Sequence, residues 1–302
     1  MSTKDLLITD RQKVRDAFEK TVKDVEKDVE IVRNWIKTQP HLPETPDYNM
    51  IEWFLVNNKF SIERTKEKLD MYYTIRGLIP EMYDNTTPTS PRMQKARKLV
   101  LTCPLPKLTK DLYRVHVIKI VGEPEEFNFY DMCAYILNTL EVRLHEDLAL
   151  GDIYIGDYEK LKMGHVVKIT PVHMKKLSHI FEKVLSNRIK GIHVIQSPSY
   201  VDIVVNIAKS VLKPKLARRI HVHDRLEALY EYVSKDVLPS EYGGEERPLK
   251  ELIELWDKKL EENCDRFDKL SKMRVNEELR PEPLKNDEIL GFHGNFKKLD
   301  VD

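Results

Sequence analysis

One segment of this 302-residue chain limits its possible folds more than any other. Residues 200–212 form a predicted helix that is apolar nearly all round, because its polar side chains Asp202, Asn206 and Lys209 share one narrow stripe. A strand at 192–195 precedes it, and Ser197-Pro198 supplies a possible helix cap with a proline suited to a first turn. A surface helix normally has a narrow apolar stripe, so this one must be covered on most sides.

Basic residues flank this helix on both sides. They are Arg188 and Lys190 before it and Lys213, Lys215, Arg218 and Arg219 after it. Two interpretations are open at this point. The helix is either a buried crossover helix of an α/β sheet with ordinary solvated charges at its ends, or a cover for a bound lipid that also meets an anionic membrane.

Composition excludes several classes of function. Lys+Arg and Asp+Glu are both 50, and a net charge of zero argues against nucleic acid as the main partner. The three cysteines contain no CxxC pair, which indicates neither a disulfide framework nor a zinc site and favours a reducing cytosol. The start of the chain lacks a signal-peptide pattern, and no apolar run reaches transmembrane length. We therefore expect a soluble protein whose membrane contact is peripheral.

The first part of the chain is predicted to be all-helical. Apolar residues recur every three or four positions over 11–37, which predicts one long helix, and packing within its own domain is favoured over a coiled coil. Two shorter helices follow after a proline-rich break, and the second ends near Gly77 and Pro80. The run DNTTPTSP at 84–91 is a predicted linker.

Beyond this linker, strands and helices alternate. Strands are predicted at 115–121, 152–157, 191–196 and 218–223, and helices at 128–150, 171–186 and 200–212. This alternation predicts a mainly parallel sheet with right-handed crossovers. An amphipathic helix near 249–270 follows, and Phe292, Phe296 and Leu299 form either a docked apolar turn or part of a frayed terminus.

Catalytic and metal-binding patterns are absent. There is no GxGxxG, Walker A or GxSxG motif. His221 and His223 share one face of a strand, but no further ligand accompanies them, so strand-ending histidines are favoured over a metal. Asp157 ends a strand, where we expect it to hydrogen-bond in the turn before Glu159 rather than act as an acid. His173 and His179 are expected to be hydrated and unpaired.

Several motifs resemble one known family. The helix begun by KITP, the segments RIKGIHVIQSPSY and ARRIHVH, and above all the tight turn LPSEYGGE are similar to the CRAL-TRIO lipid-binding family, in the branch of α-tocopherol transfer protein and cellular retinaldehyde-binding protein. The resemblance spans about residues 10–270, and the ending resembles that of insect members. In LPSEYGGE, the side chains of Glu241 and Tyr242 are expected to fix neighbouring segments of the chain in place.

The resemblance implies an α/β fold with an N-terminal all-helical module. An α/β/α CRAL-TRIO domain follows, whose mainly parallel sheet floors an apolar cavity that a mobile helix, about 199–212 here, would close. The implied boundaries are 1–90 for the helical module, 91–247 for the lipid-binding domain and 248–302 for a C-terminal helix and tail.

The resemblance also implies two sets of binding residues. The ligand-binding positions that match the family's cavity are Cys133, Ile136, Leu140, Ile169, Leu177, Ile180, Phe181, Leu185, Val201, Val204, Val205 and Ala208. Arg188, Lys190, Lys215 and Arg219 match a basic cleft that binds membranes and phosphoinositides. This chain departs from the family at Asn58, which stands where an arginine of that cleft is expected.

The resulting hypothesis is an intracellular carrier without catalytic activity, cofactor or metal. It would bind one small hydrophobic lipid, of the tocopherol, retinoid, carotenoid, sterol or phospholipid class, in a lidded cavity and transfer it to membranes. It would be a cytoplasmic monomer that associates transiently with anionic membranes. The alternative is a lipid-sensing regulatory or interaction protein with no transfer role.

Overall fold

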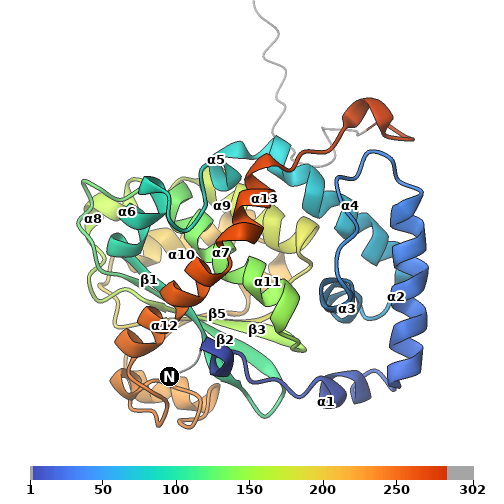
Figure 1. Ribbon diagram of the computed structural model, residues 1–302. Coiled ribbons are helices and arrows are strands. Elements are labelled where there is room, and N and C mark those ends of the chain that lie inside the picture. The colour runs from blue at the N-terminus through green and yellow to red at the C-terminus, as the bar shows by residue number, and fades with distance from the viewer. Residues whose placement is uncertain (1–2, 284–302) are drawn as a thin grey trace, which may run out of the picture.

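The computed structural model describes residues 3–283 and begins with a helical module. Figure 1 shows α2, α3 and α4 gathered on one side of the molecule, with the sheet and its covering helices on the other. The elements of this first part are η1 Thr3–Leu6, α1 Arg11–Asp16, α2 Val22–Lys37, α3 Tyr48–Asn57, α4 Ile62–Leu78, α5 Pro80–Tyr83 and α6 Pro91–Leu99.

The single helix predicted over 11–37 is wrong, because the structure contains two. The first ends at Asp16, and Glu19 adopts a left-handed φ of 56°. Thr21 and Asp24 then form a capping box, in which each side chain bonds the other's backbone N–H, and this begins α2. Because Val14 and Phe18 keep helical spacing across the break, the apolar period alone could not reveal it.

A five-stranded sheet forms the centre of the second part, in the order β1-β2-β3-β4-β5. β1 pairs antiparallel with β2, and the other neighbours are parallel, so the expected mainly parallel sheet is confirmed. The sequence did not reveal β1, whose Pro104 and Pro106 are tolerated at a sheet edge beside a bulge. The strands are β1 Val100–Leu108, β2 Tyr113–Ile120, β3 Gly151–Asp157, β4 Ile189–Ile195 and β5 Ile220–Val222.

Helices cover both faces of the sheet. Side chains of β3 alternate, so Ile153 and Ile155 join one apolar cluster while Tyr154 joins the other. The Tyr154 side is covered by α7 Phe129–Glu146, α9 Pro171–His179 and α10 Val201–Val211, with α8 Met163–Val166 and α11 Pro214–Ala217 beside them. The other face is covered by η3 Leu226–Glu231, η4 Ser240–Tyr242 and α12 Leu249–Glu262.

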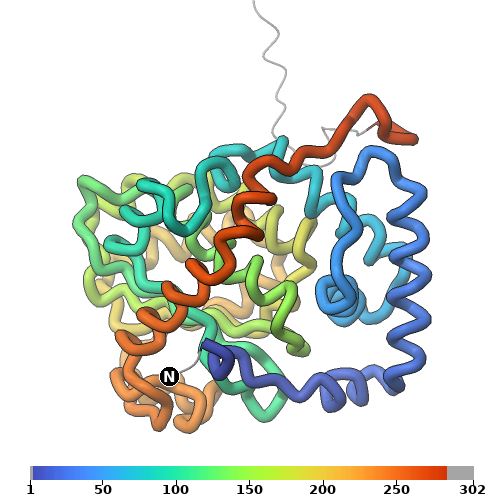
Figure 2. Tube along the Cα trace, in the orientation of Figure 1, coloured from blue at the N-terminus to red at the C-terminus, as the bar shows by residue number. Residues whose placement is uncertain are grey.

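Several predicted helix boundaries differ from the structure. The helix expected over 171–186 is α9 followed by a π-helical turn, Ile180–Val184, and the helix expected over 249–270 breaks at Asn263 before α13 Cys264–Lys272. Ser197 does not cap α10, which begins after Tyr200 without a side-chain cap. Figure 2 shows α12 and α13, in orange and red, running across the outside of the molecule toward the helical module.

The turn LPSEYGGE fixes the end of the α/β part. The Glu241 carboxylate accepts the backbone N–H of Leu249 at 2.9 Å, and the Tyr242 hydroxyl donates to Asp157 at 2.9 Å. Gly243 has a φ of 67°, which favours glycine. The expectation that Glu241 and Tyr242 hold neighbouring chain is therefore confirmed. The predicted apolar turn at Phe292, Phe296 and Leu299 lies outside the described residues.

Candidate ligand-binding and membrane-facing site

An apolar cavity lies beneath α10. Its volume is about 170 Å³, and its floor is the sheet, where Ile118, Tyr154, Ile192, Val194 and Ile220 present their side chains. The residues that close it from above come from α7, α9, the π-helical turn and α10, and they include Ile136, Met174, Leu177, Phe181, Val204, Val205 and Ala208. α10 therefore shields this space from solvent with the side of the helix that carries Val204 and Ala208.

The predicted ligand-binding residues divide into two groups. Those that line the cavity are Ile136, Leu177, Phe181, Val204, Val205 and Ala208. The remaining ones are buried in the same apolar cluster without lining the cavity: Cys133, Leu140, Ile169, Ile180, Leu185 and Val201. A ligand-binding role stays a prediction for both groups.

Other lining residues were missed from the sequence. Tyr158, Ser178, Ile189, Leu212 and Leu216 line the cavity together with the floor residues named above. Strand alternation could have identified the floor, since every second residue of a strand faces the same side. The face of the sheet that meets α9 and α10 could not be chosen from that pattern alone.

The cavity is smaller than those of typical ligand sites, which have volumes of about 300–1,000 Å³. α10 packs against α9, and Tyr200 fastens the start of α10 because its hydroxyl donates to the Leu161 carbonyl at 2.7 Å. The first turn of α10 is thus held to the segment before α8, and the helix lies directly over the cavity.

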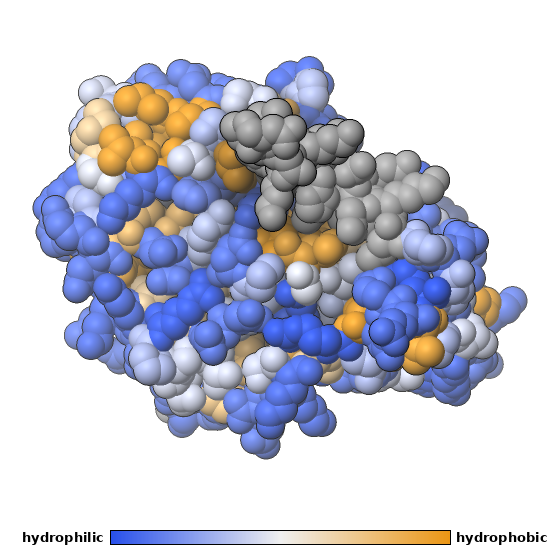
Figure 3. Space-filling model, turned by 90° about the horizontal axis from the view of Figure 1, so that it is seen from above, coloured by the Kyte–Doolittle hydropathy of each residue, from blue (hydrophilic) through white to orange (hydrophobic). Residues whose placement is uncertain are grey.

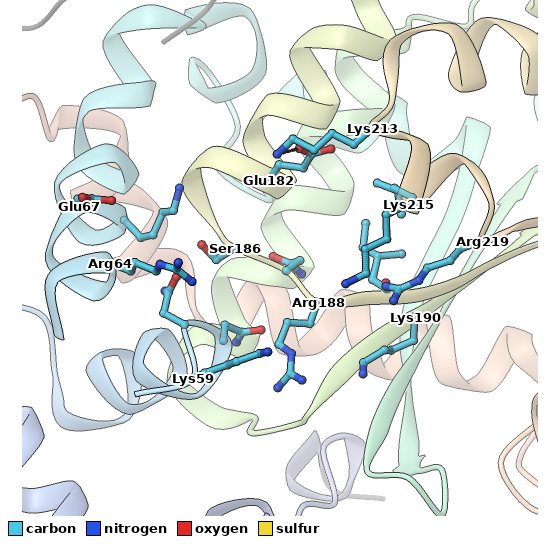
Figure 4. Close-up of a pocket in the computed structure, with 16 residues that line it drawn as sticks. Lys59, Arg64, Glu67, Glu182, Ser186, Arg188, Lys190, Lys213, Lys215 and Arg219 are labelled. Atoms are coloured by element: carbon cyan, nitrogen blue, oxygen red, sulfur yellow. Dashed lines mark hydrogen bonds and ion pairs between the residues drawn. The ribbon is translucent and has the colours of Figure 1, made fainter. Parts of the chain in front are cut away.

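A second, basic pocket of about 570 Å³ opens next to this cavity. Figure 4 shows it between the helical module, which supplies Lys59 and Arg64, and the amino ends of β4 and β5. The structure brings the four predicted basic residues together here: Arg188, Lys190, Lys215 and Arg219. Arg188 directly precedes β4 and Arg219 directly precedes β5, and the amino ends of neighbouring parallel strands meet at one edge of a sheet.

The sequence indicated Lys213 as a flank of the apolar helix, but the resemblance did not assign it or the other cations to this pocket. Lys59, Arg64 and Lys68 come from the helical module, and Lys213 follows α10. The acidic residues of the lining are Glu67 and Glu182, and Glu182 pairs with Lys213 at 2.6 Å. Lysine and arginine therefore outnumber the carboxylates of the lining.

Burial, together with neighbouring cations, lowers the pKa of two basic residues near this pocket. Burial, with Lys183 and Lys213 nearby, lowers the pKa of Lys68, and burial with Arg219 nearby lowers the pKa of Arg188. The Nη1 atom of Arg188 is buried and has no hydrogen-bond partner among the described residues. An anion in the pocket would relieve both the repulsion and the unpaired donor.

Asn58 does not replace the missing arginine. Its amide donates to the Phe54 carbonyl at 2.9 Å at the end of α3, and its side chain is buried. The next residue, Lys59, has a left-handed φ of 54° and lines the pocket instead. Without an arginine at position 58, the cations that the helical module contributes to the basic pocket are Lys59, Arg64 and Lys68.

Large apolar side chains are exposed around α10. Ile203 lies on the outer side of α10. Met163 lies on α8, Val167 directly follows α8, and Val172 lies on α9. Val167 is 70% exposed. Figure 3 shows apolar surface gathered on the left, the side on which Figure 1 shows α8. Exposed apolar side chains on one surface are a feature that a membrane surface attracts.

The histidines and Asp157 have structural partners. Asp157 accepts the backbone N–H of Glu159 at 3.1 Å, which confirms its expected role in the turn. His173 is not unpaired as expected, since its Nδ1 lies 3.1 Å from the Lys168 carbonyl oxygen. His193, His221 and His223 stack on the sheet face opposite the cavity, where burial and the other two rings lower the pKa of His193 to about 3.

The described residues contain neither a cluster of metal-binding side chains nor a membrane-spanning helix. Within residues 3–283, no group of three or more His, Cys, Asp or Glu is arranged to hold a metal ion. No helix in that part of the chain has the length and apolar character to span a membrane.

Comparison with known proteins identifies the family. Family models match at residues 21–93 ("Pinta-like, UBA domain") and 102–244 ("CRAL/TRIO domain"). The human "Alpha-tocopherol transfer protein-like" is 27% identical over 248 residues, 80% of this chain and 70% of that protein. "Clavesin-1" of Xenopus laevis is 28% identical over 226 residues, 72% of this chain and 67% of that protein. The solved structure titled "Crystal structure of Sfh5" aligns with a TM-score of 0.49 and 9% identity, covering 82% of this chain and 93% of that chain. The predicted resemblance is confirmed by the family model: residues 102–244 match the CRAL/TRIO domain family.

Proposed function

We propose that this chain binds one small hydrophobic lipid beneath α10 and transfers it to anionic membranes. The observation that carries the proposal is the position of the two pockets, which share Ile189 and Leu216 in their walls. An apolar space therefore adjoins a strongly basic one. The name of the relative "Alpha-tocopherol transfer protein-like" supports a transfer role. Tocopherols, retinoids, carotenoids, sterols and phospholipids are the candidate ligand classes.

The apolar cavity supplies affinity through burial alone. Each ligand methylene removed from water contributes about 0.8 kcal/mol, so a chain of a dozen carbons binds without a specific polar contact. Because the cavity is only about 170 Å³, uptake and release require α10 to swing outward. The predicted lining residues Ile136, Leu177 and Phe181 would then contact the ligand from the side opposite the sheet.

The basic pocket provides the membrane contact. Each basic residue near an anionic surface contributes roughly 1 kcal/mol, and the exposed Met163, Val167 and Ile203 add apolar contact. Arg188, Lys190, Lys215 and Arg219 would bind lipid head groups, with phosphoinositides as candidates. The chain would act as a cytoplasmic monomer that associates transiently with membranes, and the cycle contains no chemical step.

Transfer of a fluorescent lipid between vesicles tests this proposal. Donor vesicles carry the labelled lipid, acceptor vesicles contain an anionic lipid, and a variant with Arg188, Lys190, Lys215 and Arg219 changed to alanine is compared with wild type. We expect transfer to slow by about tenfold or more, since several cations act together. The matched control removes four exposed lysines elsewhere, Lys23, Lys27, Lys250 and Lys258, and should retain the wild-type rate.

Equal rates for wild type and the pocket variant would exclude the basic pocket from transfer. Failure of the wild-type chain to bind any of the candidate lipid classes would exclude the carrier function. Retained lipid binding with negligible transfer, together with a stoichiometric protein partner, would instead support a lipid-sensing regulatory protein.

A further inference from the structure

Polar atoms without partners gather around Tyr154, a residue that lines the apolar cavity. The Tyr154 Oη, His116 Nδ1, Arg143 Nη1 and Asn187 Oδ1 atoms are buried, and none has a hydrogen-bond partner among residues 3–283. Buried polar atoms in folded proteins nearly always have a partner. A group of them in one place therefore indicates a site that something else completes.

Hydrogen bonds and a ring contact connect these residues into one cluster. Asp152 accepts from Asn187 Nδ2 at 2.8 Å and from Arg143 Nη2 at 2.6 Å. Tyr154 follows Asp152 by two positions on β3, so both side chains point to the same side of the sheet. The ring of Tyr154 stacks on that of His116, with centroids 5.4 Å apart. The four unpartnered atoms thus belong to adjoining side chains.

Tyr154 joins this cluster to the cavity. Its ring lines the cavity and meets the ring of Phe181 edge-on, with centroids 5.6 Å apart. The side chain as a whole is only 7% exposed, and its hydroxyl lies covered behind the cavity wall. A ligand that pushes this wall back as the cavity widens brings its leading atom to the Tyr154 hydroxyl.

The charges of the surrounding residues are already balanced. Arg114 and Arg143 both pair with Asp147, and Arg143 also pairs with Asp152. A carboxylate at this place would add a third negative charge to two buried arginines and two buried aspartates, which is unfavourable without a counter-ion.

The unpartnered atoms include both donors and an acceptor. Burial and Asp152 raise the pKa of Tyr154 although Arg143 and Asn187 beside it act in the opposite direction, and burial lowers the pKa of His116, so the phenol keeps its proton and the imidazole stays neutral. Arg143 Nη1 can only donate, and Asn187 Oδ1 can only accept. A hydroxyl group, which donates one hydrogen bond and accepts others, satisfies both kinds at once.

We propose that the Tyr154 end of the cavity binds a hydroxyl group of the ligand, so that the ligand is a largely apolar molecule with one neutral hydroxyl. The proposal rests on the carrier function above and adds which end of the ligand enters first. Tyr154 then acts as a specificity-determining residue, because a ligand without the hydroxyl leaves the buried polar atoms unpaired.

Three probes with the same chain length test this assignment: hexadecan-1-ol, its methyl ether and hexadecanoate. Each competes with a pyrene-labelled hydrocarbon for the full-length protein. We expect wild type to prefer the alcohol to the ether and to hexadecanoate by about tenfold, the order of one hydrogen bond made in a buried site. Tyr154→Phe should bind alcohol and ether equally and keep the wild-type affinity for the ether.

Tyr158→Phe is the matched control, since Tyr158 lines the same cavity without joining the polar cluster. It should keep the preference for the alcohol. An equal affinity of wild type for alcohol and ether would overturn the hydroxyl site and show that buried water alone completes the cluster. A preference for the alcohol that survives in Tyr154→Phe would overturn the assignment of the site to Tyr154. Tighter binding of hexadecanoate than of the alcohol would overturn the ligand class. Failure of the labelled hydrocarbon to bind at all would instead refute the carrier function.

Discussion

The hydroxyl of Tyr72, on α4, donates to the carboxylate of Glu141, on α7, at 2.7 Å. This hydrogen bond joins the helical module to the α/β part inside the protein. Arg76 of α4 and Arg266 of α13 also reach Glu141, at 3.3 and 3.1 Å. Three segments that are distant in the sequence therefore depend on one buried carboxylate.

Replacing Glu141 with glutamine should destabilise the fold strongly. The buried guanidinium of Arg76 would lose its ionic partner, and breaking a buried pair costs about 3–5 kcal/mol. Chemical denaturation measures the free energy of unfolding. Glu254→Gln removes an exposed carboxylate of α12 and should change it by less than about 0.5 kcal/mol. A similar, small effect of both variants would show that Glu141 does not hold the parts together.

His145 should make stability depend on pH in the alkaline range. Burial lowers its pKa, but hydrogen bonds to Asp47 and Glu141 prevail and raise it from 6.5 to about 9. Between pH 6.5 and pH 9, His145 is protonated in the folded protein and deprotonated in the unfolded chain. The contribution of protonated His145 to the free energy of unfolding is therefore complete below pH 6.5 and disappears as the pH rises through 9. This loss amounts to about 2–3 kcal/mol.

Denaturation curves between pH 6 and 10 measure this effect. In His145→Gln the decline over this range should become flatter, while the stability at pH 10 should stay close to that of wild type. Parallel curves for the two proteins would show that His145 keeps an ordinary pKa.

Filling the cavity should block lipid uptake without preventing membrane contact. Ala208 lines the cavity from α10, and phenylalanine in its place occupies much of the roughly 170 Å³. We expect labelled lipid to bind at least about tenfold more weakly, at a stability cost of roughly 1–3 kcal/mol from overpacking. Binding to anionic vesicles, measured by sedimentation, should persist.

The control for this change is Ile203→Phe, on the outer side of the same helix, where the side chain is 44% exposed. This variant should take up lipid as wild type does. If Ala208→Phe also binds lipid normally, the ligand lies elsewhere.

Glycine should be indispensable at position 244 and replaceable at position 77. A Cβ atom at Gly244 would lie 1.9 Å from the Leu238 carbonyl oxygen, so Gly244→Ala must distort the turn after Leu238. At Gly77, inside α4, nothing lies within 4 Å of the added atom. Thermal unfolding should show Gly244→Ala destabilised by several degrees and Gly77→Ala unchanged or stabilised, because alanine favours a helix by up to about 1 kcal/mol. Equal melting temperatures would contradict the close approach at Gly244.

The sequence predicted the elements whose signals are local. The helix α10 has nearly the expected extent, Val201–Val211, but the expectation that it is covered on most sides is wrong, since the side that carries Ile203 is exposed. β1 was missed because it contains Pro104 and Pro106, and proline is tolerated in a strand only at positions such as the edge of a sheet. The break between α1 and α2 was missed because Phe18 continues the apolar period, while the left-handed Glu19 leaves no pattern.

The candidate site could be predicted only where its residues are near in sequence. Arg188 and Lys190 come together with Lys215 and Arg219 because two parallel strands begin side by side. Lys68 lies more than a hundred positions away, and only the packing of the helical module brings it to the same pocket. Tyr154 was missed because strand alternation does not tell which side of β3 faces a cavity.

The wall made by Ile189 and Leu216 has two sides, one toward the oily space and one toward the cations. Consequently, a substitution at Ile189 or Leu216 changes the apolar cavity and the basic pocket together. Shortening the Leu216 side chain to widen the apolar cavity would also change the shape of the basic pocket, so under the proposed function the choice of lipid and the choice of membrane would change together.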